Sequence, residues 1–422
     1  MFERVVVIGA GIAGLSAVHA ALPRGAEVKL IDGPPGASAL AGGAVDDQPW
    51  EQVERACELL GASPVAGPVA PEIEAFVQAL GVWELCRPGA PLCRLATEAG
   101  RIRLARGRDR ALLDLAGLPR GARVLLPRVA RPEWDADALG RALSEEPYAR
   151  DHELRFEAVT ATMLRLVGEE RVVSAELAAR HDQPARLEWL AERLRETLGL
   201  ERQAERRVDA VLLGPWLGAE APRAAALAEK LGVPVGEILS GVGSAPGQRF
   251  EAARDRMLGA RGVQREARRA LSVRAVEAEL RIEAEGAGVA LVADRLVLAT
   301  GGVAGGGIRY APPERDAGAD EPPAARVPFV LSLAAPVALA AFGRRLEIVG
   351  SVHGPALDES AWPTGADPSL LECVGIACHG PVAAERIYAA GDVVADRPRT
   401  RLEAVRSGLR AGAAAAGEPG DP

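Results

Sequence analysis

The stretch VVVIGAGIAGLSAV (5–18) decides the fold of this 422-residue chain. Its apolar, mostly β-branched start predicts a buried parallel strand, and residues 12–21 predict a helix. The glycines allow a tight turn, close approach of a ligand's pyrophosphate to the backbone, and tight packing of helix on strand. The helix N-terminus then offers unpaired N–H groups to an anion. The predicted contacts are Gly9, Gly11, Ile12, Ala13 and Gly14.

A second strand, AEVKLID (26–32), ends in an acid that is followed by Gly33. This spacing places the Asp32 carboxylate where the ribose of an adenosine half would offer its hydroxyls. The two segments together predict a dinucleotide site. The alternative is a tight strand–helix–strand turn that holds no ligand.

Composition narrows the function classes. A net charge of −8 gives no basic face for nucleic acid. The longest apolar stretch, residues 332–342, contains a proline and is shorter than the roughly 20 residues that span a bilayer. No signal peptide is expected before the first strand, so a cytoplasmic protein is predicted.

The five cysteines are Cys57, Cys86, Cys93, Cys373 and Cys378. They form no CxxC pair, so neither a zinc site nor an iron–sulfur cluster is predicted. Cys373, Cys378 and His379 come closest to a metal cluster, but buried apolar cysteines are the favoured interpretation.

Two helices are predicted in the middle of the chain. The segment DADALGRALSEE (135–146) indicates a capped helix that starts at Asp135 or Asp137. Residues 184–207 carry leucines spaced for one helix face among many charges, which is typical of a solvated outer helix packed through its leucines.

Small residues recur at three predicted strand ends that lie far apart in the chain. They are the turn at 9–14, then Thr300, Gly301 and Gly302, and finally Gly391 with Asp392. Ligands bind outside the carboxyl ends of the strands in doubly wound sheets. We therefore expect an α/β protein with a discontinuous Rossmann-like domain and an inserted α+β cap domain. The expected nucleotide-binding parts are 1–65, 241–310 and 375–422; the cap is 66–240, with an associated segment at 311–374.

The turn at 9–14, LATGG (298–302) and IYAAGD (387–392) resemble, in this order, the two-dinucleotide-binding-domain flavoproteins. The resemblance implies that the first glycines cradle the FAD pyrophosphate and that Asp32 holds the ribose. It also implies that Asp392 contacts the ribityl or pyrophosphate part. FMN is the alternative cofactor, although it lacks the adenosine half that Asp32 would address.

The loop SALAGGAVDD (38–47) is similar to the serine and Gly-Gly loop that borders the flavin in the succinate dehydrogenase and fumarate reductase branch. The matching positions are Ser38, Ala41, Gly42 and Gly43.

Over almost its whole length the chain resembles the family of B-type subunits of anaerobic glycerol-3-phosphate dehydrogenase. The similar segments are 38–46, 243–257, 296–307, 351–360 and 387–394. The resemblance implies a flavin-bearing subunit that pairs with a catalytic flavoprotein subunit and a membrane-associated iron–sulfur subunit. It places the chain at the inner face of the membrane through a partner.

The chain departs from that family after the last motif, where ADRPRTRLEAV (395–405) replaces a glycine-rich run. If Arg399, Thr400 or Arg401 lies beside flavin N1 and the C2 carbonyl, positive charge there would stabilise reduced anionic flavin. The alternative is that both arginines point to solvent.

A catalytic base is not evident. His353 and His379, both expected in glycine- and proline-flanked turns, are the candidate bases. Arg249 is either an anion contact or a helix-start salt bridge. Three functions stay open: an electron-transferring flavin subunit of a membrane-linked dehydrogenase that oxidises a small hydroxy compound; a stand-alone FAD-dependent oxidoreductase of a hydroxy or amino compound; and a flavoprotein-like assembly subunit without cofactor.

Overall fold

The computed structural model describes residues 3–46, 69–277, 279–302, 305–308, 328–332, 338–340, 348–349, 351–356, 375–395 and 397–417. The chain divides into two compact units. The first unit is Met1–Ser38, Asp47–Phe76 and Leu258–Pro422, and the second is Ala39–Asp46 and Val77–Met257. Residues 39–46 and 241–257 thus belong to the second unit, whereas we expected both in the nucleotide-binding domain.

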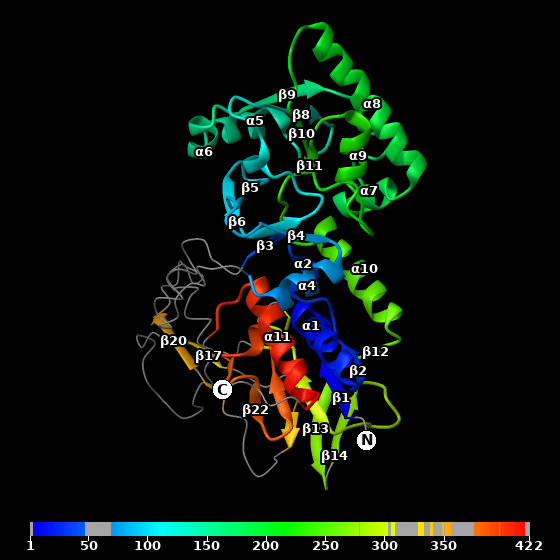
Figure 1. Ribbon diagram of the computed structural model, residues 1–422, viewed down its shortest axis with the longest axis vertical. Coiled ribbons are helices and arrows are strands. Elements are labelled where there is room, and N and C mark those ends of the chain that lie inside the picture. The colour runs from blue at the N-terminus through cyan, green and yellow to red at the C-terminus, as the bar shows by residue number, and fades with distance from the viewer. Residues whose placement is uncertain are drawn as a thin grey trace, which may run out of the picture. The chain divides into compact units, whose positions relative to one another are not determined.

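The main sheet of the first unit has the strand order β12-β2-β1-β16-β23-β22 (Figure 1). Its strands are β1 (Arg4–Ile8), β2 (Glu27–Asp32), β12 (Gln264–Ala267), β16 (Arg295–Leu298), β22 (Val382–Ala384) and β23 (Ile387–Ala389). All neighbours are parallel except β22, which runs antiparallel to β23. The five parallel strands, with β12 at one edge and β23 at the other, place β1 and β16 at the centre, as in a doubly wound sheet. The predicted α/β class and Rossmann-like fold are confirmed.

Helices cover one face of this sheet. α1 (Ile12–Ala21) and α11 (Arg401–Ala415) lie side by side (blue and red in Figure 1). Glycines on α11 make this contact close: a Cβ on Gly408 would lie 2.2 Å from the Ala13 carbonyl oxygen, and one on Gly412 would lie 2.1 Å from that of Ala17. The contact joins the first and last helices of the first unit.

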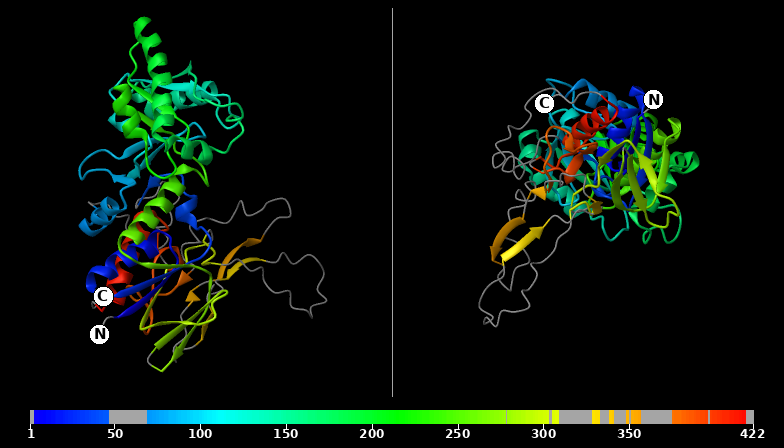
Figure 2. Two further views of the ribbon diagram at one scale, coloured as in Figure 1. Left: turned by 90° about the vertical axis from the view of Figure 1, so that its right-hand side faces the viewer. Right: turned by 90° about the horizontal axis from the view of Figure 1, so that it is seen from below.

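A second sheet, β15-β14-β13-β18, packs on the other face. Figure 2 shows its hairpin on the side of the main sheet away from α1 and α11. Val6 and Ile8 of β1 point into this core with Val273 and Ile282. The strands are β13 (Ala270–Val276), β14 (Glu279–Ala284), β15 (Leu291–Ala293) and β18 (Ala338–Ala340). Two further strand pairs lie in the described part of the unit: β17 (Pro328–Ser332) with β20 (Ser351–Ala356), and β19 (Ile348–Val349) with β21 (Gly375–Ile376).

The second unit is built on a four-stranded parallel sheet, β11-β10-β8-β9. The strands are β8 (Arg123–Arg128), β9 (Arg155–Thr160), β10 (Ala210–Leu213) and β11 (Val235–Glu237). Its helices are α5 (Ala136–Glu145), α6 (Pro147–Asp151), α7 (Ser174–His181), α8 (Pro184–Gln203) and α9 (Ala224–Leu231). α10 (Ala245–Ala260) belongs to this unit up to Met257. α8 packs through Leu187, Leu190, Leu194 and Leu198, all buried, and Asp135 caps α5, as the sequence predicts.

Short antiparallel sheets accompany the parallel one. One is β3 (Ala44–Val45), β7 (Gly107–Asp109) and β4 (Trp83–Leu85); the other is β5 (Cys93–Ala96) with β6 (Ile102–Ala105). The described residues also form the helices α2 (Ala37–Leu40) and α4 (Pro71–Leu80), each of which has residues in both units. Among the described helices, none is both long and apolar enough to cross a membrane.

Candidate functional site

Four parallel strands of the first unit end at the same edge of the main sheet. The pairing register aligns Ile8 with Ile31 and Leu298, and Leu298 with Ala389. The residues that follow these strands therefore meet there. The order of the strands reverses between β1 and β16, which is where a doubly wound sheet opens a crevice for a ligand.

The turn after β1 needs two of its glycines for packing. Gly9 has φ +109°, and a Cβ on it would lie 2.1 Å from the Ala299 carbonyl oxygen. A Cβ on Gly14 would lie 1.8 Å from the Gly9 carbonyl oxygen. Neither position has room for a side chain, so α1 lies directly against β1 and β16.

Gly11 serves a different purpose. Its backbone has φ −69°, which any residue adopts, and a Cβ on it would meet only the Ser38 hydroxyl, at 3.3 Å. The Ile12 N–H donates to Ser38 Oγ at 3.0 Å, while the Ala13 and Gly14 amides have no hydrogen-bond partner among the described residues. The positive end of α1 therefore presents free donors beside a hydroxyl, a combination that suits an anion.

The end of β16 is a glycine-lined turn. Gly301 has φ +78° and lies against Gly305, and a Cβ on Gly307 would lie 1.8 Å from the Gly301 carbonyl oxygen. The Thr300 hydroxyl oxygen is buried and has no hydrogen-bond partner among the described residues. A buried, unpaired hydroxyl at a strand end is the kind of group that a polar ligand satisfies.

Asp392 follows β23 and lies next to the β16 turn. A Cβ on Gly302 would come within 2.9 Å of the Asp392 Cβ. Burial raises the pKa of the Asp392 carboxyl, and the nearby Arg399 charge partly opposes this. No hydrogen bond to this carboxyl exists among the described residues, so it can accept one from a ligand hydroxyl.

The turn at Gly391 ties β23 to the first helix. Gly391 has φ +75°, and a Cβ there would lie 2.7 Å from the Ala13 Cβ. Its N–H donates to Ser407 Oγ of α11 at 3.0 Å. The glycine turn at 9–14 and the final strand–helix unit therefore meet, as the sequence predicts.

Asp32 has a partner that sequence reasoning missed. Its Oδ2 accepts from Arg265 Nε at 2.9 Å and lies 2.6 Å from Arg265 Nη2. Arg265 comes from β12, the strand paired with β2, where Asp32 itself pairs with Ala267. The arginine fixes the orientation of the carboxylate at the strand end. Gly33 beside it is exposed, and a Cβ on it would meet nothing within 4 Å.

The predicted loop positions divide between the units. Ser38 belongs to the first unit, and Ala41, Gly42 and Gly43 belong to the second. A Cβ on Gly42 would lie 1.9 Å from the Ser240 carbonyl oxygen, and Gly43 has φ +111°. Close packing within the second unit explains why glycine is needed at both positions. Their predicted contacts with a flavin stay predictions.

Arg401 begins α11 and is half-buried, and Thr400 caps that helix by accepting from the Glu403 N–H at 3.2 Å. The helix N-terminus thus stands beside the β23 end, because Ser407 on its second turn reaches Gly391. The predicted contact of Arg401 with a flavin ring stays a prediction.

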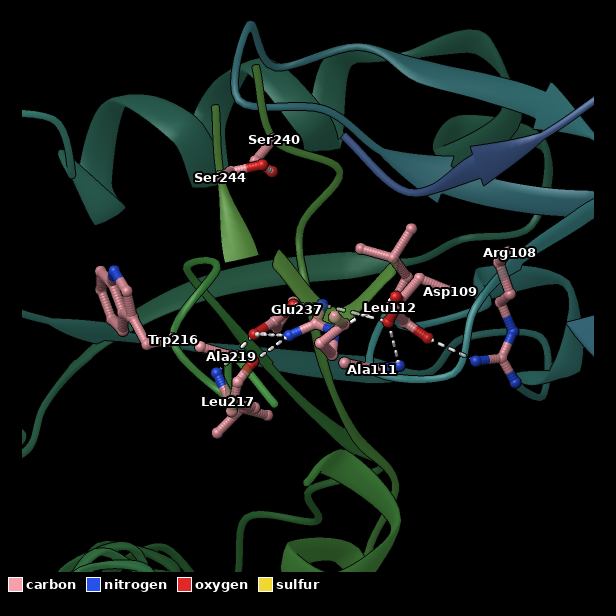
Figure 3. Close-up of polar contacts among 12 residues, drawn as sticks. Arg108, Asp109, Ala111, Leu112, Trp216, Leu217, Ala219, Glu237, Ser240 and Ser244 are labelled. Atoms are coloured by element: carbon pink, nitrogen blue, oxygen red, sulfur yellow. Dashed lines mark hydrogen bonds and ion pairs between the residues drawn. The ribbon is translucent and has the colours of Figure 1, made fainter. Parts of the chain in front are cut away.

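Arg249 is a buried ion-pair residue and has no exposed surface. Its Nη2 lies 2.6 Å from Glu237 Oε2 and 3.0 Å from Asp109 Oδ1. Figure 3 shows Asp109 and Glu237, which come from β7 and β11, in this network. Of the two alternatives for Arg249, the structure supports the salt bridge; a direct contact with substrate would need a surface that this side chain lacks.

The two histidine candidates occupy different places. His353 lies in β20, paired with Val330, so the expected turn is wrong there; its side chain is outside the described part. His379 lies in a tight turn closed by its backbone pair with Val382, and its side chain is exposed. Pro381 in this turn accepts from the Ala389 N–H, which puts His379 near the carboxyl end of β23.

Metal ligands are scarce among the residues that the structure describes, where no group of three or more His, Cys, Asp or Glu could hold an ion. Cys57 and Cys373 lie outside those residues. Cys378 is half-buried, and burial raises the pKa of its thiol to about 11.

Comparisons with known proteins give only distant likenesses. No family model and no curated protein matches the sequence. A 3-ketosteroid delta1-dehydrogenase from Sterolibacterium denitrificans is 15% identical over 71% of this chain and 48% of its own, with a TM-score of 0.27. Iminodiacetate oxidase from Chelativorans sp. is 16% identical over 73% of this chain and 59% of its own, with a TM-score of 0.24. An oxidoreductase from Agrobacterium tumefaciens is 12% identical over 98% of this chain and 97% of its own, with a TM-score of 0.32. The chain spans about half of the length of the first of these proteins.

Proposed function

We propose that the chain is a flavin-dependent oxidoreductase that holds FAD at the carboxyl edge of the main sheet. One observation carries the proposal. Four parallel strands end at one edge of the sheet, on both sides of the point where the strand order reverses. At or just beyond these strand ends lie the turn at 9–14, Asp32, Thr300 and Asp392.

The residues at this edge have groups that could bind the pyrophosphate and the adenosine ribose of FAD. The pyrophosphate would be held by the amides of Ala13 and Gly14 and by the Ser38 hydroxyl. Gly11, which has no side chain, leaves room for it. Asp32, oriented by Arg265, would accept from the adenosine ribose. Because FMN lacks this adenosine half, Asp32 favours FAD.

The other end of the site would hold the redox half of the cofactor. Asp392 would accept from a ribityl hydroxyl, and the Thr300 hydroxyl would find there a partner that it lacks among the described residues. When bound, the isoalloxazine ring supplies hydride or electron transfer. The N-terminus of α11 and Arg401 would add positive potential near its pyrimidine edge.

The finer proposal rests on the family resemblance of the sequence. We propose an electron-transferring subunit that serves the oxidation of a small hydroxy compound similar to glycerol 3-phosphate and passes electrons to an iron–sulfur or quinone-linked partner. Arg249 is held in a buried ion pair, so it does not reach a substrate. A catalytic flavoprotein subunit would then oxidise the substrate.

The competing functions make different predictions. A stand-alone dehydrogenase or oxidase would bleach its flavin when one small molecule is added to the purified chain. An assembly subunit without cofactor would be colourless and would not bind FAD. The electron-transferring subunit would bind FAD, act poorly alone and co-purify with a partner that carries cysteine clusters.

FAD titration of two glycine variants tests the site. Gly11→Ala keeps an ordinary backbone conformation but puts a methyl group where the pyrophosphate would approach, so we expect FAD affinity to fall about 100-fold. Gly259→Ala on α10 meets nothing within 4 Å and serves as the matched control, with affinity unchanged. Equal affinity of both variants and the parent chain would contradict the proposed site.

A further inference from the structure

Two cysteines of the second unit, Cys86 and Cys93, bring their sulfur atoms to 3.0 Å from each other. Cys86 follows β4 and Cys93 begins β5. The Cys93 N–H also donates to Cys86 Sγ at 3.2 Å. The sulfur–sulfur contact and the hydrogen bond from the Cys93 backbone therefore hold the two thiols together.

The backbone on both sides of the pair is fixed to the same strand region. The Cys86 N–H donates to the Arg106 carbonyl oxygen at 2.8 Å, and Cys93 pairs with Ala105 of β6. The connecting residues 87–91 are exposed and join the two cysteines as a surface loop. A disulfide needs the sulfurs about 1 Å closer, which side-chain rotation within such a frame can supply.

We propose that Cys86 and Cys93 are a redox-active pair that forms a reversible intramolecular disulfide when the protein meets a peroxide. The Cys86 thiolate attacks one oxygen of hydrogen peroxide, which gives a sulfenic acid and hydroxide. The Cys93 sulfur then attacks the Cys86 sulfur, and the sulfenic oxygen leaves as water with the Cys93 proton. Two thiols are oxidised, one peroxide is reduced to two waters, and a dithiol reductant reverses the change.

The two thiols differ in solvent exposure and in pKa, and so in their roles in the reaction. Cys86 is half-buried and Cys93 is buried, so the oxidant reaches Cys86 first. The hydrogen bond between the two thiols lowers the pKa of Cys86 to about 7, and the same bond together with burial raises the pKa of Cys93. Asp114 and Arg108, the charges that face the pair, act on Cys86 in opposite senses. Cys86 is therefore the attacking thiolate and Cys93 the resolving thiol.

Two alternatives explain the pair less well. A structural metal would need further ligands, and the described residues include no group of three that could supply them. Two inert core thiols would both be buried, whereas Cys86 is accessible.

Peptide mapping of the full chain tests the pair directly. Cleavage after Glu84 and Glu98 releases residues 85–98, which contain Cys86 and Cys93 and no other cysteine. After treatment with stoichiometric hydrogen peroxide and blocking with N-ethylmaleimide, we expect this peptide to lose the mass of two hydrogens and to carry no label. Reduction with dithiothreitol should restore two labelling sites.

Controls show whether the disulfide forms because of the fold or only because the two cysteines are close in sequence. At neutral pH, disulfide formation should be about tenfold faster in the folded chain than in urea, because the folded chain holds the two sulfurs 3.0 Å apart. Cys86→Ser and Cys93→Ser should each abolish the linked peptide, and Cys378→Ser should leave it unchanged. Equal rates in the folded and unfolded chain, or a sulfinic Cys86 beside a labelled Cys93, would overturn the proposal. This inference does not depend on the proposed flavin function.

Discussion

Ser38 Oγ accepts the Ile12 N–H at 3.0 Å, so a hydroxyl from α2, the short helix in the loop after β2, lies at the N-terminus of α1. The two residues belong to different elements of the first unit, and the hydrogen bond fixes the loop across the edge where β1 and β2 end. Next to them, a Cβ on Gly36 would touch Gly305 beyond β16, so the same loop also reaches the β16 turn. The loop therefore bounds the candidate site on one side.

Removal of this hydroxyl should affect both stability and binding. Ser38→Ala leaves the Ile12 amide without its acceptor, and we expect the free energy of unfolding to fall by about 1 kcal/mol. FAD affinity should fall about tenfold, since the pyrophosphate loses a hydroxyl donor. Urea unfolding and FAD fluorescence titration measure the two effects. Ser272→Ala on β13, whose hydroxyl bonds Glu283 at the surface, should leave FAD affinity unchanged. Unaltered affinity in Ser38→Ala would remove Ser38 from the site.

Two glycine-to-alanine changes inside helices should have opposite signs. On α11, a Cβ at Gly412 would lie 2.1 Å from the Ala17 carbonyl oxygen of α1, so Gly412→Ala must separate the two helices. We expect a loss of about 2–4 kcal/mol. On α8, Gly199 has nothing within 4 Å, and Gly199→Ala should gain about 0.5–1 kcal/mol from helix propensity. Urea unfolding followed by circular dichroism would measure the free energy of unfolding of both variants. A Gly412→Ala variant as stable as the parent chain would contradict the close helix contact.

Arg249 should matter for folding. In Arg249→Met, Asp109 and Glu237 stay buried without their cation, and we expect a loss of about 3–5 kcal/mol. Burial already raises the pKa of Glu237, so the folded variant binds protons more tightly than the unfolded chain. Its stability should therefore fall as pH rises above the ordinary pKa of a glutamate, about 4.5.

The surface variant Arg120→Met, which breaks an exposed pair with Glu153, is the control and should leave the unfolding midpoint unchanged. A normally folded Arg249→Met with selectively impaired substrate turnover would instead assign Arg249 a catalytic part.

His181 should make the second unit sensitive to acid. Its ring is buried, Nδ1 lies 2.7 Å from the Trp216 carbonyl oxygen, and burial lowers its pKa to about 4. The unfolded chain takes up this proton near pH 6.5 but the folded chain does not. Stability is thus complete above pH 6.5 and decreases as pH falls toward 4, by up to about 3 kcal/mol.

Urea unfolding between about pH 7.5 and 5 measures this slope, and His181→Asn should flatten it. The exposed His152 offers a matched variant, His152→Asn, which should leave it in place. A slope that is the same in all three chains would exclude His181 as its source.

Local sequence patterns predicted the parts of the fold whose causes are local. The turn at 9–14 has the glycines that its conformation and packing require, the leucines of α8 have helical spacing, and Asp135 is a hydrogen-bonded cap. The meeting of three distant strand ends was also predictable, because parallel strands of one sheet share a carboxyl edge.

Contacts between residues far apart in sequence could not be predicted. Arg265 reaches Asp32 only because β12 pairs with β2, and no motif marks a pairing between strands so far apart. The same holds for Arg249 with Asp109, which depends on how strands of the second unit are arranged. Cys86 and Cys93 are only seven residues apart, but their contact depends on how β4 and β5 are placed, which the spacing of the two cysteines does not indicate. His353 was expected in a turn because glycine and proline follow it, but pairing with β17 keeps this segment extended.

The most direct test of the central claim is to identify what the purified full chain releases on denaturation. Chromatography of the supernatant should show FAD at about one equivalent per chain if the edge of the main sheet is a dinucleotide site. A chain that releases no flavin, and that after refolding does not quench the fluorescence of added FAD, would contradict the account.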